Sequence, residues 1–409
     1  MKTVKYKQNQ FKLLRNFFTY IMFTCLNLLN VNAQSNKTSL SEIIDRNIKL
    51  AKTQYLYMTA KLPDQRMPRS YNVTGDSLTT SNTKWWCSGF YPGTLWYIYE
   101  YTKDTNILWA AEKSLSLLEP EKHYTGNHDL GFMMYCSFGN AYRISGNKAY
   151  KPTIDTAAIS LISRYRPAIK SIQSWNKNQH FNCPVIIDNM MNLELLMWVA
   201  RQNNNKELEE IAINHANSTL KYHFRKDNSS YHVLDYNLNN KEVIGKRTWQ
   251  GISDSSAWSR GQAWGLYGFT MMYRFTKKQE YLNQANKIAT FMLIHPNMPD
   301  DYIPYWDYND PAIPATYRDA SAAAIMASAL LELGNYCNKK QKDYYKKIAE
   351  KIILNLSDSR YLNDACTYGG FLIRHSVGGL PQKSEIDVPL TYADYYFIEA
   401  MLRYKKYYL

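Results

Sequence analysis

The sequence lacks the marks of several protein classes. Glycine and proline account for only 31 of its 409 residues, and no low-complexity tract or collagen-like period occurs. With 45% hydrophobic and 21% charged residues, the composition is that of a globular protein rather than a disordered one. There is no P-loop, no GxGxxG after a predicted strand, no HExxH and no GxSxG. These absences argue against nucleotide-binding, zinc-protease and α/β-hydrolase chemistry.

Cysteine is scarce, and its spacing argues against a zinc site. The six cysteines are widely separated, and none forms a CxxC pair. Five of them follow residue 33, namely Cys87, Cys136, Cys183, Cys337 and Cys366. We interpret these as buried free thiols, with a disulfide as the alternative that an exported protein would permit.

Long apolar runs are also absent, except for one near the N-terminus. Residues 1–15 carry five positive charges and no acid, residues 17–31 are mostly apolar, and Asn32-Ala33 follows. This order predicts a secretory signal peptide over residues 1–33, cut after Ala33. A membrane anchor is the alternative, but the run is shorter than the roughly 20 residues of a span. A lipoprotein attached at Cys25 fits less well, because the preceding Met-Phe-Thr is a poor lipobox. We expect residues 34–409 to form one exported domain, periplasmic and free of the membrane.

The charge balance is basic. Formal net charge is +14, and loss of residues 1–33 leaves 44 basic against 35 acidic residues, or +9. A cationic surface attracts polyanions, so an anionic polysaccharide is the favoured partner, although the charge also fits a simple solubility role. No block of basic residues occurs, and we expect no nucleic-acid partner. The 14% aromatic content suits a cleft that stacks on sugars, as well as an aromatic core.

Helical patterns dominate, and they come in pairs. In each pair the first helix is apolar almost all round and the second has one apolar face, which indicates inner and outer helices. Ser39 and Glu42 are spaced as a capping box. The simplest closed arrangement is all-α, an (α/α)6 barrel of six hairpins; an open solenoid would need a regular period. The expected pairs are 92–103 with 106–118, 129–144 with 148–163, 189–201 with 206–222, 257–275 with 279–294, 318–334 with 341–356, and 388–406 with 40–60. Strands are expected only at 230–236 and 368–375.

Two carboxylates occupy unusually apolar settings. Asp129 begins an inner helix in HDLGFMMYC, and Asp188 lies in VIIDNMMN. An aspartate at a helix start is often a cap, and this interpretation stays open for Asp129. Asp188 needs a partner or a raised pKa, because a buried charge is costly. Two carboxyl groups that face one central pocket are the usual catalytic groups of enzymes that cleave glycosidic bonds.

A third cluster spans residues 248–268. Arg260 and Trp264 are four residues apart and share one helix face, which offers a guanidinium group for a carboxylate and an indole for a sugar. Thr248 opens the cluster as a further substrate-binding candidate. Outside it, His128 and His232 are candidates with a structural alternative, and Trp86 and Trp175 either stack on sugar or anchor loops.

Five segments together resemble a known family. They are WCSGFYPGTLWYIYE, HDLGFMMYCSFGNAYR, CPVIIDNMMNLELLMW, SAWSRGQAWGLYGF and SEIDVPLTYADYYFIEA. The chain is similar, from about residue 85 to 400, to the unsaturated glucuronyl hydrolases of glycoside hydrolase family 88. The related unsaturated rhamnogalacturonyl hydrolases share the fold and are the main confusable group.

The resemblance implies an (α/α)6 barrel that removes a 4,5-unsaturated uronic acid from the non-reducing end of oligosaccharides, without a metal or cofactor. It implies hydration of the ring double bond, with Asp188 as the acid/base and Asp129 as the assisting carboxylate. The implied substrate-binding positions are His232, Gln250, Arg260 and Trp264, with Trp86, His128 and Trp175 lining the pocket.

The substrate expected from this resemblance is an unsaturated disaccharide of a glycosaminoglycan, and the basic charge favours a sulfated one. Ser376, Lys383 and Ser384 are candidates to contact a sulfate, with a purely structural loop as the alternative. The competing functions are an unsaturated rhamnogalacturonyl or ulvan-derived uronyl hydrolase and, in a different class, a non-catalytic glycan-binding protein.

Overall fold

The computed structural model describes residues 39–409, so the predicted signal peptide at 1–33 lies outside the described residues. The chain divides into Met1–Glu42 and a larger compact unit, Ile43–Leu409. In the described part of the first unit, the predicted capping box is confirmed. The Ser39 backbone N–H donates to Glu42 Oε2 at 2.7 Å, and the Glu42 N–H donates to Ser39 Oγ at 3.3 Å.

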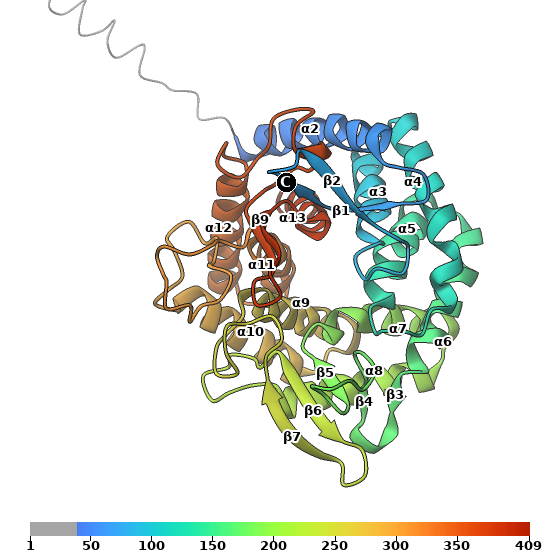
Figure 1. The fold of residues 1–409 in the computed structure, drawn as a ribbon, viewed down its shortest axis with the longest axis vertical. Coiled ribbons are helices and arrows are strands. Elements are labelled where there is room, and N and C mark those ends of the chain that lie inside the picture. Colours follow the sequence, from blue (N-terminus) through green and yellow to red (C-terminus); the bar gives the residue numbers. More distant parts are fainter. Residues whose placement is uncertain (1–38) are drawn as a thin grey trace, which may run out of the picture. The chain divides into compact units, whose positions relative to one another are not determined.

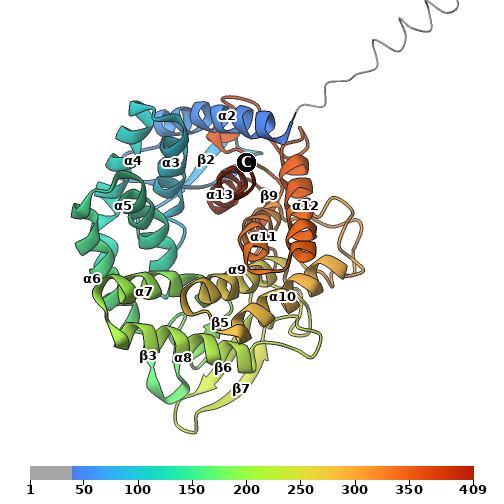
Figure 2. The same ribbon diagram turned by 180° about the vertical axis from the view of Figure 1, so that it is seen from behind.

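Within Ile43–Leu409 the helices form two concentric layers around a ring (Figures 1 and 2). The inner layer is made of α3 (Phe90–Thr102), η2 (Gly131–Gly139) with α5 (Asn140–Ser145), α7 (Asn189–Asn203), α9 (Ser259–Thr276), α11 (Ala320–Leu333) and α13 (Thr391–Tyr408). The outer layer is made of α2 (Leu40–Lys61), α4 (Thr105–Leu118), α6 (Lys151–Ile162), α8 (Lys206–Tyr222), α10 (Gln279–Ile294) and α12 (Lys339–Leu356). Because α13 packs on both α3 and α11, the inner ring is closed. The predicted (α/α)6 barrel is confirmed.

Composition separates the two layers. Every residue of α11 (ASAAAIMASALLEL) is buried, whereas α12 buries one stripe that includes Ile348, Ile352 and Leu356. A helix that is apolar all round must be covered on all sides, and a one-faced helix covers it from outside. Each inner helix starts at the same end of the ring, where the long inter-hairpin loops gather.

Strands are confined to those loops and pair antiparallel. They are β1 (Met67–Asn72) with β2 (Ser77–Ser81), β3 (Tyr165–Arg166) with β4 (Ser171–Ile172), β5 (Pro184–Ile186) with β6 (Val233–Asn237) and β7 (Glu242–Arg247), and β8 (Ser376–Gly379) with β9 (Ser384–Val388). The strand expected at 230–236 is confirmed as β6. The strand expected at 368–375 is wrong, because Gly369 and Gly370 take φ values of +63° and +94° and turn the chain instead.

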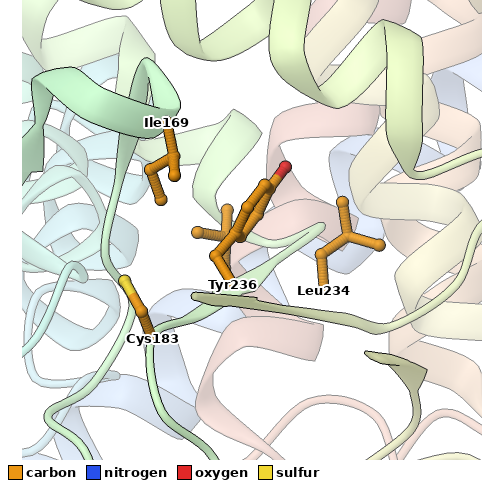
Figure 3. Packing of buried hydrophobic residues seen from close by; sticks show 5 residues of the cluster. Ile169, Cys183, Leu234 and Tyr236 are labelled. Atoms are coloured by element: carbon orange, nitrogen blue, oxygen red, sulfur yellow. The ribbon is translucent and has the colours of Figure 1, made fainter. Parts of the chain in front are cut away.

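The three-stranded sheet is held by a small apolar cluster. Ile169, Cys183, Leu234 and Tyr236 gather there with Val185 (Figure 3). This packing fixes the end of β5, which Asp188 follows two residues later, and the start of β6, which His232 directly precedes. The sheet therefore serves as a platform for the site described below.

One inner segment departs from the predicted helix at 129–144. Its first nine residues, Gly131–Gly139, form a π-helix, and only Asn140–Ser145 is α-helical. A Cβ on Gly131 would lie 2.4 Å from the Cα of Asn192, so α7 approaches this segment too closely for any larger residue. π-Helical turns are rare and occur frequently at functional sites.

Two further sequence expectations concern cysteines and membranes. The five cysteines after residue 33 are free, as predicted, although Cys366 is exposed and only Cys87 and Cys183 are fully buried. Among residues 39–409, no helix has the length and hydropathy needed to cross a membrane.

Candidate active site

Both predicted carboxylates lie at the starts of inner helices, and neither caps its helix. Asp188 is the residue before α7, yet its side chain accepts no hydrogen bond from the first turn. Asp129 precedes η2, whose N-cap position is Leu130, again without a side-chain cap. By contrast, Asp319 accepts from the N–H groups of Ser321 and Ala322 at the start of α11. The capping interpretation of Asp129 is therefore wrong.

Asp188 is desolvated and only partly satisfied. Its side chain is 11% exposed, and its Oδ2 atom is buried with no hydrogen-bond partner among residues 39–409. Burial raises the pKa of Asp188 to about 7, although the charge of Arg260 and the indole N–H of Trp264 act to lower it. A carboxyl group in this state can hold a proton near neutral pH and still release it to a substrate.

His232 faces Asp188 as a neutral donor. Its Nδ1 accepts hydrogen bonds from the backbone N–H groups of Trp249 and Gln250 at 3.0 and 3.1 Å. Burial lowers the pKa of His232 to about 3, so the ring carries one proton, which must be on Nε2. Nε2 lies 3.7 Å from Asp188 Oδ2. The Ile187 N–H donates to the His232 carbonyl at 3.0 Å, which extends the β5–β6 pairing and keeps the two residues together.

Asp129 has a matching imidazole. His128 Nε2 lies 3.4 Å from Asp129 Oδ1, and burial holds the pKa of His128 well below its ordinary value. Burial and then the nearby charge of Asp188 raise the pKa of Asp129 to about 8. Because two neighbouring buried carboxylates cannot both ionise freely, the pair retains at least one proton at neutral pH.

Arg260 lies beside this pair but is already engaged. It is 1% exposed and donates to Asp319 Oδ2 at 3.0 Å. It also donates to the Gly378 carbonyl at 2.6 Å and to the Val377 carbonyl. These bonds fix the position from which the Arg260 charge acts on Asp188. Trp264 acts on the same carboxyl group, as expected for two residues on one helix face. Direct contact between Arg260 and a substrate carboxylate remains a prediction.

Gln250 and Thr248 shape the loop that positions His232. Besides its backbone bond to His232, Gln250 donates from Nε2 to the Gly378 carbonyl at 2.8 Å, so Gln250 and Arg260 together hold the start of the β8–β9 hairpin. Thr248 Oγ1 accepts from the Gly251 N–H at 2.7 Å. These bonds are structural, and binding of substrate by either residue stays a prediction.

Aromatic side chains pack against one another beside the candidate site. The Trp86 ring lies 4.9 Å from Tyr392 and 5.6 Å from Phe132, and Phe132 in turn lies 5.0 Å from Trp264. Trp175 follows Ser174, whose carbonyl accepts from the His128 N–H. Several buried polar atoms here have no partner within the described part of the chain, namely Asp188 Oδ2, His232 Nε2, Trp264 Nε1 and Trp175 Nε1. Unsatisfied buried polar atoms of this kind are candidates for hydrogen bonds to a ligand.

Comparison with known proteins matches this arrangement to one family. Residues 59–407 match the description "Glycosyl Hydrolase Family 88". The unsaturated glucuronyl hydrolase of Formosa agariphila is 44% identical over 82% of this chain and 84% of its own length.

The chain belongs to glycoside hydrolase family 88.

Solved structures of family 88 enzymes share the architecture. A crystal structure of an unsaturated glucuronyl hydrolase specific for heparin is 43% identical, with a TM-score of 0.86, and the match covers 89% of this chain and 97% of that one. A mutant of the unsaturated glucuronyl hydrolase from Streptococcus agalactiae, complexed with dGlcA-GalNAc6S, is 26% identical. Its TM-score is 0.77, and the match covers 90% of this chain and 92% of that one.

Two residues of this family 88 site escaped sequence reasoning. Asn192 lies one turn after Asp188 on α7 and contacts His128. The available signal was a pair of amides, Asn189 and Asn192, in the otherwise apolar start of an inner helix. Asp319 pairs with Arg260 from a position 59 residues away, and no local pattern links the two.

The sulfate candidates of the β8–β9 hairpin lie in different environments. Ser376 is fully buried, and its Oγ accepts from the Ser321 N–H at 3.1 Å. Ser384 Oγ accepts from Arg69 at 3.3 Å. Lys383 alone of the three is exposed. Among residues 39–409, no group of three or more His, Cys, Asp or Glu side chains is placed to hold a metal ion.

A separate cavity of about 510 Å³ includes neither Asp129 nor Asp188, although Gly131, Phe132 and Met191, near the starts of their helices, are among its lining residues. Tyrosines, arginines and glutamates line it, and the charged groups pair with one another. Arg274 donates to Glu194 at 2.8 Å, and Tyr267 and Arg403 both contact Glu399. These paired groups form a rear network in the barrel interior, in which Arg274 Nε has no hydrogen-bond partner among the described residues.

Proposed function

We propose that this chain removes a 4,5-unsaturated uronic acid from the non-reducing end of lyase-generated glycosaminoglycan oligosaccharides. The observation that carries the proposal is the pair of desolvated carboxyl groups, Asp188 and Asp129, which cap no helix and each face the Nε2 of a neutral histidine. Membership of family 88 and the names of the relatives support the same activity.

The proposed reaction begins at the double bond rather than at C1. The vinyl ether is electron-rich, so the Asp188 carboxyl group donates its proton to C4 and positive charge develops at C5 and the ring oxygen. In this step the proton that the pair retains is on Asp188, even though the pKa of Asp129, about 8, exceeds that of Asp188, about 7. The ionised Asp129 carboxylate then stabilises the positive charge. Water then adds at C5, and Asp188 takes up the proton that the water loses.

The product of hydration explains how the glycosidic link is lost. The C5 hemiketal opens to a ketone, which leaves a hemiacetal at C1, and this hemiacetal releases the second sugar as a free alcohol. One water molecule is consumed, and Asp188 recovers its proton, so the reaction needs no redox partner. The usual choice between inversion and retention at C1 does not arise.

The test follows the ultraviolet absorbance of the conjugated double bond. Wild-type protein should consume an unsaturated disaccharide, and Asp188→Asn should lose on the order of 10² to 10⁴ of the rate, the range expected for a general acid. Asp104→Asn is the matched control, because Asp104 also begins a helix but caps it, and asparagine caps equally well.

Either of two results would contradict the proposal. Asp188→Asn turning over substrate as fast as wild type would remove Asp188 from the acid role. Wild-type protein that binds unsaturated disaccharides in calorimetry yet leaves their absorbance unchanged would favour the non-catalytic glycan-binding alternative.

The preferred substrate is proposed to be sulfated. Support comes from the basic charge of +9 without residues 1–33, from exposed Lys383, and from the name of the heparin-specific relative. A panel of heparin, chondroitin and hyaluronan disaccharides, with ulvan and rhamnogalacturonan fragments, measures the preference as kcat/KM. Faster turnover of the ulvan or rhamnogalacturonan fragments would establish the same-class alternative instead.

Export to the periplasm, with cleavage after Ala33, is proposed from the N-terminal charge and hydropathy pattern. N-terminal sequencing of protein recovered from the periplasmic fraction should begin at Gln34. Full-length protein retained in the membrane fraction would support the anchor alternative.

A further inference from the structure

Asn192 lies between the two helices that carry the carboxylates. It is on α7, four residues after Asp188, and it is 1% exposed. Its Oδ1 accepts a hydrogen bond from the Phe132 N–H at 2.8 Å, in the first turn of η2. That backbone donor fixes the orientation of the side-chain amide, so the Nδ2 end must point the other way.

The Nδ2 end meets His128. Asn192 Nδ2 lies 3.3 Å from His128 Nδ1, and an amide nitrogen can only donate, so Nδ1 accepts. Because His128 is neutral, its single proton is on Nε2, the atom 3.4 Å from Asp129 Oδ1. Two donors therefore run in one direction, from the Phe132 N–H to Asn192 and from Asn192 to His128, and they leave the His128 Nε2–H 3.4 Å from Asp129 Oδ1.

We propose that Asn192 is a positioning residue that keeps His128 in the Nε2–H form, so that His128 presents a donor to the assisting carboxylate Asp129. This role rests on the proposed function of Asp129. The arrangement mirrors the Asp188 side, where backbone N–H groups of the Trp249–Gln250 loop fix the tautomer of His232. A side-chain amide replaces those backbone donors on the Asp129 side.

The surroundings support this role. Hydrogen bonding by Asn192 acts to lower the pKa of Asp129, against the larger effect of burial. The close packing of Gly131 on the Asn192 backbone leaves little room for either helix to shift. The titratable and charged groups that act on His128 and Asp129 from neighbouring elements are Asp188, Arg164, His215 and His232. None of these donates to His128 Nδ1, and Asn192 is the one hydrogen-bond partner of that atom in the described part of the chain.

The direct test reads the histidine tautomer by ¹⁵N NMR. In wild-type protein, the His128 signals, assigned by their loss in His128→Gln, should show a protonated Nε2 and an unprotonated Nδ1. In Asn192→Asp the side chain keeps its shape but cannot donate to Nδ1, so His128 should change to the Nδ1–H form. Wild-type His128 in the Nδ1–H form, or an unchanged tautomer in Asn192→Asp, would overturn the proposal.

The functional test is the pH profile. Asn192→Asp places a lone pair and a further negative charge near Asp129, so Asp129 should hold its proton to higher pH. We expect kcat to fall by about 10- to 100-fold, the usual cost of losing a supporting partner, with KM little changed and the pH profile displaced. Asn47→Asp is the control, since Asn47 is equally buried and hydrogen bonded to Ser357 outside the site; it should leave the profile in place.

Failure of this proposal can be told apart from failure of the proposed function. The tautomer is measured without substrate, so it reports on Asn192 even if no unsaturated disaccharide is consumed. An active enzyme whose Asn192→Asp variant loses only stability, with an unmoved pH profile, would leave Asn192 a purely structural residue and would contradict the inference.

Discussion

At the scale of single residues, the site depends on carboxyl groups that the fold keeps from their ordinary behaviour. Asp188 and Asp104 both begin helices, yet they have opposite pKa shifts. Burial raises the pKa of Asp188. In Asp104, bonds from Lys52 and two backbone N–H groups outweigh burial and lower the pKa. The difference lies in what the fold supplies to the carboxylate oxygens, because Asp188 Oδ2 receives no hydrogen bond from the part of the chain that the structure describes.

This difference predicts how stability changes with pH. Asp188 has a raised pKa in the folded state, so its stability contribution is complete below about 3.8 and is lost as pH rises toward about 7. Asp188→Asn removes that loss. The free energy of unfolding of the variant should therefore exceed that of wild type by about 2–4 kcal/mol at pH 8, and the difference should vanish near pH 4. Denaturant unfolding at several pH values measures it. Asp104→Ala should show the opposite trend, and equal stability of Asp188→Asn and wild type at pH 8 would contradict the raised pKa.

At the scale of elements, the loops before the inner helices do more than connect them. Asp319 caps α11 and also pairs with Arg260 on α9, and Arg260 in turn holds carbonyl groups of β8. One buried side chain therefore joins two helices and a strand beside the site. A helix cap alone is worth about 1 kcal/mol, whereas an uncompensated buried charge costs several times more.

We therefore expect Asp319→Ala to cost about 3–5 kcal/mol of unfolding free energy, because it leaves the Arg260 guanidinium buried without a counter-charge. Asp104→Ala, which removes a cap without stranding a buried charge, should cost only about 1 kcal/mol. Chemical denaturation compares the two variants directly. Similar losses in both would show that the Arg260 pair adds little beyond capping.

At the scale of the whole molecule, Glu332 holds three inner helices together. From α11 it contacts Arg274 of α9 at 3.0 Å and Arg403 of α13 at 3.1 Å. Burial raises its pKa, but the two guanidinium groups outweigh burial and hold the pKa below its ordinary value. This ion-pair network lies away from Asp188 and Asp129, so its contribution should be to stability.

Glu332→Gln should cost about 2–4 kcal/mol at neutral pH, with kcat close to that of wild type. Because the folded-state pKa of Glu332 is lowered, its stabilising effect is present above the ordinary value of 4.5 and is lost as pH falls below it. The difference in unfolding free energy between Glu332→Gln and wild type should therefore decrease at acidic pH. A large loss of kcat at neutral pH would show that the rear network reaches the chemistry.

The ring could be predicted from the sequence because the distribution of apolar residues around each helix indicates whether the helix is inner or outer. A segment such as ASAAAIMASALLEL can only be covered on all sides, and KDYYKKIAEKIILNL can only lie outside. The π-helix at Gly131–Gly139 could not be predicted, since it depends on how closely α7 approaches. In the site, Asp188 was visible because a charge among apolar residues stands out locally. Asn192 and Asp319 act through contacts that only the closed ring creates.

The shared direction of the inner helices has a consequence for how an anionic sugar reaches the pocket. The inner helices begin at Phe90, Gly131, Asn189, Ser259, Ala320 and Thr391. Contacts of Trp86 with Phe132 and Tyr392, of Phe132 with Trp264, and of Arg260 with Asp319 join these starts at the site. Each start carries a partial positive charge of about half an electron charge from its aligned peptide dipoles. The mouth of the barrel therefore attracts a carboxylate through its backbone, and this attraction does not titrate away as lysines would in alkaline solution.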